Sequence, residues 1–316
     1  MSDSAASLRR TISSASDLQA VVRTMKALAA SSIGQYEQSV RALADYDRTV
    51  EQGLSACLRA QAAVTDLPAA DVRRPRPGTM AVVFGSDQGL VGQFNETITD
   101  FVQARLSGAA QPVTVWAVGE RVFVRLVDAG INSRGPLVVP QSVKGITALV
   151  GQVLLKIEAA QTEHTMGDLL LFHNRPATGS VYAPVVQRLL PLDAAWQRRL
   201  VGIEWPTKNL PEVIRGGAAT LRVLVAEHLF VSLFRACAES LASENASRLA
   251  AMERADQNIS ELLEGLRARF NRLRQSSIDA ELFDVISGFE ALAPAATRRP
   301  PSDEVLVPEQ KSLRNL

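Results

Sequence analysis

The stretch MAVVFGSDQGLVGQFNETI, residues 80–98, combines three signals that decide the fold of the central part of the chain. An apolar run rich in β-branched residues predicts a strand, and glycines follow it at positions 85, 89 and 92. A helical pattern begins at Asn95. A strand, a glycine-rich turn and a helix in this order are typical of turns that bind a phosphate at a helix N-terminus. The stretch therefore predicts an α/β domain and raises the question of nucleotide binding.

The turn itself departs from the known phosphate-binding turns. A Walker loop continues with Lys and then Ser or Thr, whereas Gln93 and Phe94 follow the last glycine here. The dinucleotide fingerprint G-x-G-x-x-G is also absent, since the spacing is G-x-x-x-G-x-x-G. Asp87 lies within the turn, where its carboxylate would repel a pyrophosphate. We therefore favour a turn that lets the helix pack close to the sheet, with a dinucleotide-binding oxidoreductase as the alternative.

The residues around this stretch alternate between strand and helix patterns. This alternation predicts a Rossmann-like three-layer α/β domain with a mainly parallel sheet, spanning residues 78–210. The expected strands are 80–84, 113–118, 169–174 and 181–190, and the expected helices are 95–106, 120–129 and 142–160.

Two long helical patterns flank this insert. Apolar or small residues recur every three or four positions from Leu8 to Cys57, with no proline before Pro68. This predicts one helix of about 55 to 60 residues within segment 1–65. The same stepping fills segment 211–292. We expect the two helices to pair as an antiparallel coiled coil, and we expect part of its weakly apolar surface to face something other than the partner helix.

The composition excludes several classes of protein. The chain has 316 residues, of which 47% are hydrophobic, and its net charge of +1 argues against a nucleic-acid binder. No uninterrupted apolar run of about 18 residues occurs, so no membrane span is expected. The three histidines and two cysteines lack the spacing of a metal or redox site, so no cofactor, metal or catalytic residue is expected; they are His164, His173, His228, Cys57 and Cys237. The Pro-rich segment 293–316 is expected to be disordered.

Taken together, the terminal helices and the turn resemble the gamma subunit of F-type ATP synthases, the central rotor shaft. MKALAASSI, residues 25–33, resembles the family's MKMVAASKL, and GSDQGLVGQFN, residues 85–95, resembles SDRGLCGGLN. ESLASENASRLAAMERADQN, residues 239–258, resembles ESxASExxARMxAMxxAxxN. FNRLRQSSIDAELFDVISG, residues 270–288, resembles YNxxRQAxITxELxEIVSG, and RLLPL, residues 188–192, resembles the family's LLPL.

This resemblance implies a non-catalytic subunit that couples ion flow through a membrane ring to ATP synthesis or hydrolysis on the beta subunits. Its implied partners are the alpha and beta subunits, the epsilon subunit and the ring of c subunits, and its implied location is peripheral, on the cytoplasmic face of a bacterial inner membrane. It implies no nucleotide site in the glycine-rich turn and no direct membrane insertion. The residues implied to contact partners are Met25, Arg274, Gln275, Asp279 and Glu281.

Some positions depart from the family pattern. Asp279 replaces a Thr, Ser32 replaces a Lys, and Gln88 and Val91 replace an Arg and a Cys. These departures indicate a divergent branch, such as the alternate N-type or sodium-linked bacterial enzymes.

We also expect an antiparallel register that sets Met25 across from about Gln275. That register separates Cys57 from Cys237 by about 9 Å along the helix axis, so no disulfide is expected between them.

Overall fold

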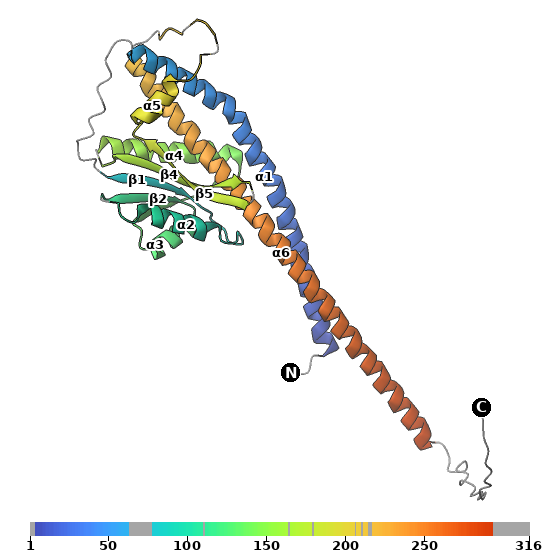
Figure 1. Ribbon diagram of the computed structural model, residues 1–316. Coiled ribbons are helices and arrows are strands. Elements are labelled where there is room, and N and C mark those ends of the chain that lie inside the picture. Colours follow the sequence, from blue (N-terminus) through green and yellow to red (C-terminus); the bar gives the residue numbers. More distant parts are fainter. Residues whose placement is uncertain are drawn as a thin grey trace, which may run out of the picture. The chain divides into compact units, whose positions relative to one another are not determined.

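The computed structural model describes residues 4–62, 78–109, 111–163, 165–178, 180–205, 207–209, 211–213 and 217–292 (Figure 1). The chain divides into two units, one formed by residues 16–260 and the other by residues 1–15 together with 261–316. His164 and the tail 293–316, which the sequence predicts to be disordered, lie outside the described residues. The domain limits expected from the sequence remain predictions.

A five-stranded sheet forms the centre of the α/β domain, in the order β3-β2-β1-β4-β5. β1 pairs in parallel with β2 and β4, and β2 pairs in parallel with β3, whereas β4 and β5 form an antiparallel pair. The strands are β1 Thr79–Phe84, β2 Val113–Val118, β3 Ser133–Leu137, β4 Asp168–Ala177 and β5 Ser180–Leu190. The predicted α/β fold with a mainly parallel sheet is therefore confirmed.

Six helices accompany the sheet in the described residues: α1 Ala5–Ala62, α2 Phe94–Leu106, α3 Glu120–Asp128, α4 Val143–Thr162, α5 Ala194–Val201 and α6 Gly217–Leu292. Neither β3 nor α5 was predicted from the sequence. β3 is the short polar stretch SRGPL, which carries no alternating apolar pattern, and α5 has only eight residues.

The sheet is covered on both faces, as its apolar strands require. Figure 1 shows α2 and α3 on one face and α4 on the other. Along β1, Ala81 and Val83 pack with α2 and α3, while Met80, Val82 and Phe84 belong to the core that includes α4 and α6. Alternate side chains of one strand thus build two cores, and the second core joins the sheet to α6.

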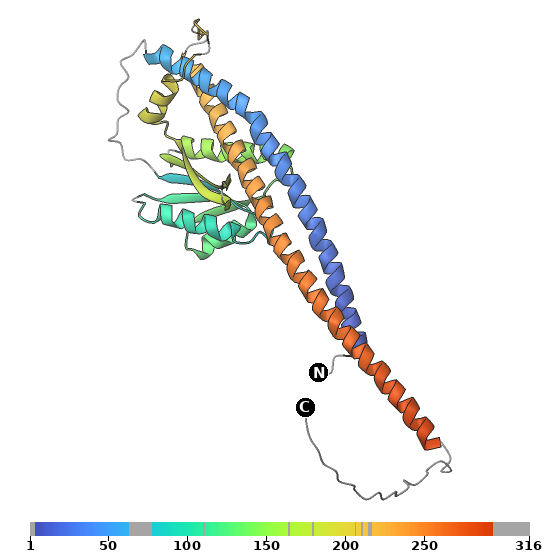
Figure 2. The same ribbon diagram turned by 45° about the vertical axis from the view of Figure 1, so that its right-hand side comes forward.

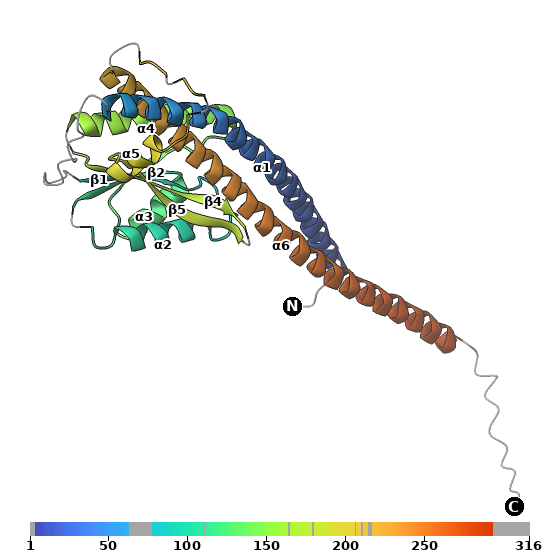
Figure 3. The same cartoon turned by 45° about the horizontal axis from the view of Figure 1, so that its top comes forward.

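Within residues 16–260, α1 and α6 run side by side and antiparallel, as Figure 2 and Figure 3 show. Val22, Ala29 and Tyr36 of α1, seven residues apart, are all buried. This is the spacing of a coiled-coil seam. The long two-helix coiled coil expected from the sequence is therefore present.

The register of this pair differs from the sequence-based expectation. Arg23 contacts Asp256 at 3.2 Å and Lys26 contacts Glu253 at 3.9 Å. Met25 consequently lies across from the neighbourhood of Arg254, whereas the expected partner Gln275 follows Arg254 by 21 residues in the sequence. The predicted register was wrong because a slide of three heptads returns small and apolar residues to the same faces, so the pattern alone does not distinguish the two.

The two cysteines are free and buried, so the prediction of no disulfide is confirmed. Tyr36 lies near Cys237, whereas the chain at Gly53, one turn before Cys57, lies against Leu224. The corrected register therefore separates the cysteines further than the sequence analysis expected. Burial raises the pKa of both thiols.

Within residues 1–15 and 261–292, the buried side chains include Leu8, Leu263 and Leu266, and the guanidinium of Arg9 lies over the ring of Phe270 at 5.6 Å. Beyond this pair, every residue of α6 from 271 to 289 is exposed. Seven large apolar side chains lie on this exposed segment: Leu273, Ile278, Leu282, Phe283, Val285, Ile286 and Phe289.

Among the described helices, α6 alone has a stretch that by length and composition could cross a membrane. An 18-residue window within Gly217–Phe289 has a mean hydropathy of 1.4. No span was expected from the sequence because it holds no long uninterrupted apolar run, which is a different measure from mean hydropathy. A helix that contributes to a core also reaches such a value, and α6 places Leu229 and Leu233 in the core beneath the sheet.

Candidate functional site: the joint between the α/β domain and the helix pair

The glycine-rich turn after β1 is shaped by close packing. A side chain at Gly85 would place its Cβ 2.3 Å from the Cβ of Val122 in α3. Gly119 has a φ of +113°, and a Cβ there would lie 2.8 Å from the backbone of Ser86. Both positions therefore require glycine so that α3 can approach the ends of β1 and β2.

Asp87 fills the place that a phosphate would take in a nucleotide-binding turn. Its Oδ1 accepts a hydrogen bond from the backbone N–H of Glu120, the first residue of α3, at 2.9 Å. Its Oδ2 accepts one from the N–H of Val139 at 2.9 Å. The chain's own carboxylate thus neutralises the positive end of α3, and a second anion would be repelled.

The open groove beside this turn is equally unsuited to a dinucleotide. It has a volume of about 520 Å³ and carries carboxylates from Asp87, Glu96 and Glu120 beside two arginines. Arg125 pairs with Glu96 at 2.5 Å, so one arginine is already neutralised. The charges of the groove therefore oppose a pyrophosphate.

The turn docks on α6. The hydroxyl of Ser247 donates to the carbonyl of Val91 at 2.5 Å, and a Cβ at Gly92 would lie 3.5 Å from the same hydroxyl oxygen. Inside the turn, Asn95 accepts from the N–H of Ser86 at 3.0 Å and donates to its hydroxyl at 2.8 Å. These bonds fix the turn and hold it against the long helix.

A second line of contacts joins β4 to α6. Ser243 donates to the backbone carbonyl of Asn174 at 3.1 Å. One turn earlier, the carboxylate of Glu239 contacts Nε2 of His173 at 2.8 Å, Arg175 at 2.7 Å and Arg235 at 2.9 Å. Glu239 is thus surrounded by three hydrogen-bond donors inside the interface.

The ionisation of this cluster follows from burial and hydrogen bonding. Burial alone would raise the pKa of Glu239, but its hydrogen bonds from His173, Arg175 and Arg235 outweigh this and lower the pKa to about 2. Burial lowers the pKa of His173, and the hydrogen bond to Glu239 offsets this only in part. A neutral His173 therefore donates through Nε2, while its buried Nδ1 has no partner among the described residues.

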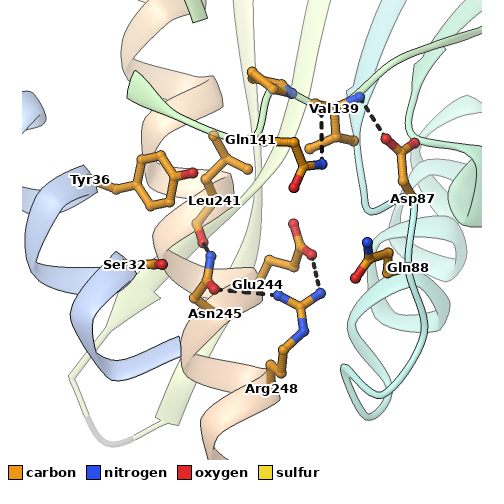
Figure 4. A pocket seen from close by; sticks show the side chains of 11 residues that line it. Ser32, Tyr36, Asp87, Gln88, Val139, Gln141, Leu241, Glu244, Asn245 and Arg248 are labelled. Carbon is orange, nitrogen blue, oxygen red and sulfur yellow. Dashed lines mark hydrogen bonds and ion pairs between the residues drawn. The ribbon is translucent and has the colours of Figure 1, made fainter. Parts of the chain in front are cut away.

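Figure 4 shows a small polar cavity next to these contacts, where α1, α6, the glycine-rich turn and the segment between β3 and α4 meet. Its volume is about 90 Å³. Glu244, which is 6% exposed, pairs with Arg248 at 2.5 Å, and Arg248 also donates to Asn245. Burial raises the pKa of Glu244 despite Arg248. The nearby Tyr36 hydroxyl also has a raised pKa, through burial first and then the charge of Glu244.

No group of three or more His, Cys, Asp or Glu side chains within the described part of the chain is arranged to hold a metal ion. The joint contains polar groups that bind one another, and its geometry supports attachment of the α/β domain to α6.

The residues singled out from the sequence lie on two surfaces. Met25 is half-buried on α1, while Arg274, Gln275, Asp279 and Glu281 are exposed on α6. Of these, Gln275 donates to Asp279 at 3.4 Å, one helical turn away.

The contact residues expected from the sequence did not include the neighbours of Met25 on α1: Leu18, Val21 and Leu28 are 54%, 55% and 64% exposed. Their spacing of three and four residues could have revealed this outer apolar face. His173, which has no metal or redox spacing in the sequence, has an acidic partner in the structure. Its partner, Glu239, is 66 residues away in the chain and could not be found from local spacing.

Comparison with known proteins places these features in one family. A family model described as ATP synthase matches residues 4–292. The chain is 26% identical over 292 residues to the ATP synthase gamma chain of Moorella thermoacetica, covering 90% of this chain and 98% of that one. It is 29% identical over 302 residues to the ATP synthase gamma chain of Anaeromyxobacter dehalogenans, with the same coverage of 90% and 98%.

Solved structures share the fold. A chain of the Euglena gracilis mitochondrial ATP synthase rotor matches 86% of this chain and 97% of its own length, with a TM-score of 0.59 and 15% identity. A chain of the Tetrahymena thermophila mitochondrial ATP synthase central stalk and c-ring matches 74% and 99%, with a TM-score of 0.53 and 21% identity. The family model spans the described residues, and the two gamma chains align with this chain over most of their own length. The chain therefore belongs to the ATP synthase gamma-chain family.

Proposed function

We propose that this chain is the central shaft of a rotary ATP synthase and couples ion translocation through a membrane ring to ATP synthesis or hydrolysis on the beta subunits. The chain itself is non-catalytic in this proposal. The observation that carries it is the uncovered end of α6, where all residues from 271 to 289 are exposed and large apolar side chains are frequent. Such a surface is typical of a segment that another protein surrounds.

The proposed contacts with the alpha and beta subunits lie on two surfaces. One is the outer apolar face of α1 around Met25, formed with Leu18, Val21 and Leu28. The other is the segment of α6 that holds Arg274, Gln275, Asp279 and Glu281, whose exposed charges can bind polar loops of a surrounding collar.

The remaining partners in the proposal are an epsilon subunit and the ring of c subunits, with the complex held peripherally on the cytoplasmic face of a bacterial inner membrane. The solved structures that share the fold support this proposal, because they are described as a rotor and as a central stalk with its c-ring. Direct insertion of this chain into the membrane and binding of nucleic acid are not part of the proposal.

The alternative, a dinucleotide-binding oxidoreductase, is not supported. Asp87 already binds the N-terminus of α3, and the adjoining groove carries three carboxylates. The matched relatives are gamma chains.

Purification of the complex from native membranes, through an affinity tag on this chain, tests the proposal. We expect alpha and beta subunits to co-purify, and we expect ATP to drive ion uptake into membrane vesicles that contain the complex. Purified chain alone should show no stoichiometric binding of NAD or NADP. Tight dinucleotide binding by the chain, without co-purifying alpha and beta subunits, would reverse the assignment in favour of the oxidoreductase.

A further inference from the structure

The interface between α6 and the sheet changes character along the helix. Near its start, α6 contributes apolar side chains such as Leu229, Leu233 and Ala236 to the core beneath the sheet. Further along, the contacts become polar at Glu239, Ser243 and Ser247, which are spaced four residues apart and therefore lie on one face of the helix. The interface thus consists of an apolar part followed by a polar stripe.

The three members of this stripe contact strand β4 and the turn that follows β1. Glu239 and Ser243 bind the β4 residues His173, Arg175 and Asn174, and Ser247 binds the turn that follows β1. β1 and β4 are neighbours in the sheet, so the stripe crosses from one strand to the next.

The stripe also reaches α1. Arg235 donates to Glu239 at 2.9 Å, and the same guanidinium lies 3.7 Å from Asp47 of α1. The carboxylate of Glu239 is therefore linked to the sheet, to its own helix and, through Arg235, to the other helix of the pair. Glu239 is 6% exposed and His173 is 1% exposed, so water competes little for the bond between them, whereas the side chains of Arg175 and Arg235 are partly exposed to water.

Apolar and polar contacts resist different movements. Burial of apolar surface opposes separation of two elements but is non-directional, so it opposes sliding weakly. Hydrogen bonds depend on distance and angle, and those to a charged group are the stronger ones. A buried charged cluster is weak evidence for stability, whereas fixing one geometry is a use that such clusters have in some proteins.

We propose that Glu239, Ser243 and Ser247 form a polar lock that transmits torque between the α/β domain and the helix pair. The inference rests on the rotor function proposed above. In a shaft, the α/β domain must turn together with α1 and α6, and the lock lies where a tangential force would otherwise turn the sheet around the helix. Glu239 is a positioning residue in this scheme, since it acts through His173, Arg175 and Arg235.

The test uses the intact complex in membrane vesicles and compares ion uptake with ATP hydrolysis in the same preparation. The double variant Glu239→Gln with Ser243→Ala should still assemble and hydrolyse ATP, but its ion uptake per ATP hydrolysed should fall about twofold or more, because charge-assisted bonds are lost. The matched controls are Glu264→Gln and Ser260→Ala, which carry the same chemical changes at exposed positions of α6 outside the stripe. Both controls should keep the wild-type ratio.

A reversible crosslink separates a lock from a role in stability alone. A Cβ at position 92 would lie 3.5 Å from the Ser247 hydroxyl oxygen, so Gly92→Cys with Ser247→Cys places two thiols within reach. The cysteine pair is combined with Glu239→Gln and Ser243→Ala. Oxidation of the pair should restore the ion uptake per ATP hydrolysed, and a reductant should lower this ratio again. If the double variant does not assemble, Ser243→Ala with the same cysteine pair is measured instead.

An unchanged ratio in the variants, or a loss that the crosslink does not restore, overturns the lock. These outcomes differ from a failure of the rotor function, which would appear in the wild-type complex as an absence of alpha and beta subunits or of ATP-driven ion uptake.

Discussion

The buried pair of His173 and Glu239 makes the stability of the folded chain depend on pH in two ways. The lowered pKa of Glu239, about 2 against an ordinary value of 4.5, means that its contribution to stability is present above pH 4.5 and lost as the pH falls toward 2. His173 has its pKa lowered from 6.5, because burial favours the neutral ring. The unfolded chain therefore takes up a proton at His173 first, and stability is lost as the pH falls below 6.5.

We expect His173→Gln to flatten the pH dependence of stability below 6.5. Gln keeps a donor for Glu239 but does not titrate, so the variant should lose less unfolding free energy than the wild type between about pH 7 and about pH 5. Urea unfolding of the full chain at both pH values measures this. His228→Gln should remove a separate part of the same slope, since burial lowers the pKa of His228 as well. Identical slopes for wild type and His173→Gln would contradict the expectation.

Asp87 is expected to be a structural residue of the turn. Asp87→Ala leaves the N–H groups of Glu120 and Val139 without their acceptor, and we expect it to lower the unfolding free energy by about 1.5–3 kcal/mol. Asp100→Ala, on the exposed face of α2, is the control and should change it by less than about 0.5 kcal/mol. A gain in nucleotide affinity without loss of stability would show instead that Asp87 guards a ligand site.

α1 and α6 illustrate what a repeated pattern does and does not specify for an element. Each helix was predictable from its spacing, but the register between them follows from specific pairs such as Arg23 with Asp256 and Tyr46 with Glu227. The docking of α6 on the sheet through Leu229 and Leu233 also limits its axial position. The seam of small residues would tolerate several registers.

Crosslinking checks the register directly. A short bismaleimide should join Lys26→Cys to Glu253→Cys in the full chain, because these side chains are in contact in the structure. Met25→Cys with Gln275→Cys is the comparison pair, since the register expected from the sequence would place them together, and it should give little intramolecular product. Efficient crosslinking of the second pair and not the first would restore the sequence-based register. Cys57 and Cys237 are buried in both variants and should react slowly.

In the part of the chain that the structure describes, the end of α6 is an exposed segment. From residue 271 to 289, α6 exposes seven large apolar side chains and a set of charges that includes Arg274 and Asp279. In the proposed complex a collar of alpha and beta subunits surrounds this segment, so its residues matter for turnover of the assembly and little for folding of the chain.

We therefore expect Arg274→Ala or Gln275→Leu to lower the ATPase activity of the assembled complex while the isolated chain stays folded. A hydrogen bond to a charged group contributes about 1.5–3 kcal/mol, which corresponds to roughly a tenfold or greater change in the affected step. The measurement is steady-state hydrolysis by the complex, with circular dichroism of the isolated chain. Arg222→Ala, near the start of α6, is the control. Wild-type turnover in both variants would remove Arg274 and Gln275 from the proposed contact surface.

Local sequence patterns predicted most of the elements, and sequence motifs indicated the family. Helical spacing in the two terminal segments predicted α1 and α6, because a face of small and apolar residues is a local property of the chain. The alternation around residues 80–98 predicted the parallel sheet, since strand, turn and helix signals are also local. The stretches 239–258 and 270–288 carried the resemblance to gamma chains.

The way these elements meet depends on contacts between segments that are far apart in the chain. Asp87 was recognised as a charge in the turn, but its role as the partner of Glu120 and Val139 depends on segments 33 and 52 residues away. The pairing of Glu239 with His173 and the register of α1 on α6 are likewise long-range. Local spacing specifies which face of an element is apolar, whereas partners and register are set by directional contacts between residues that only folding brings together.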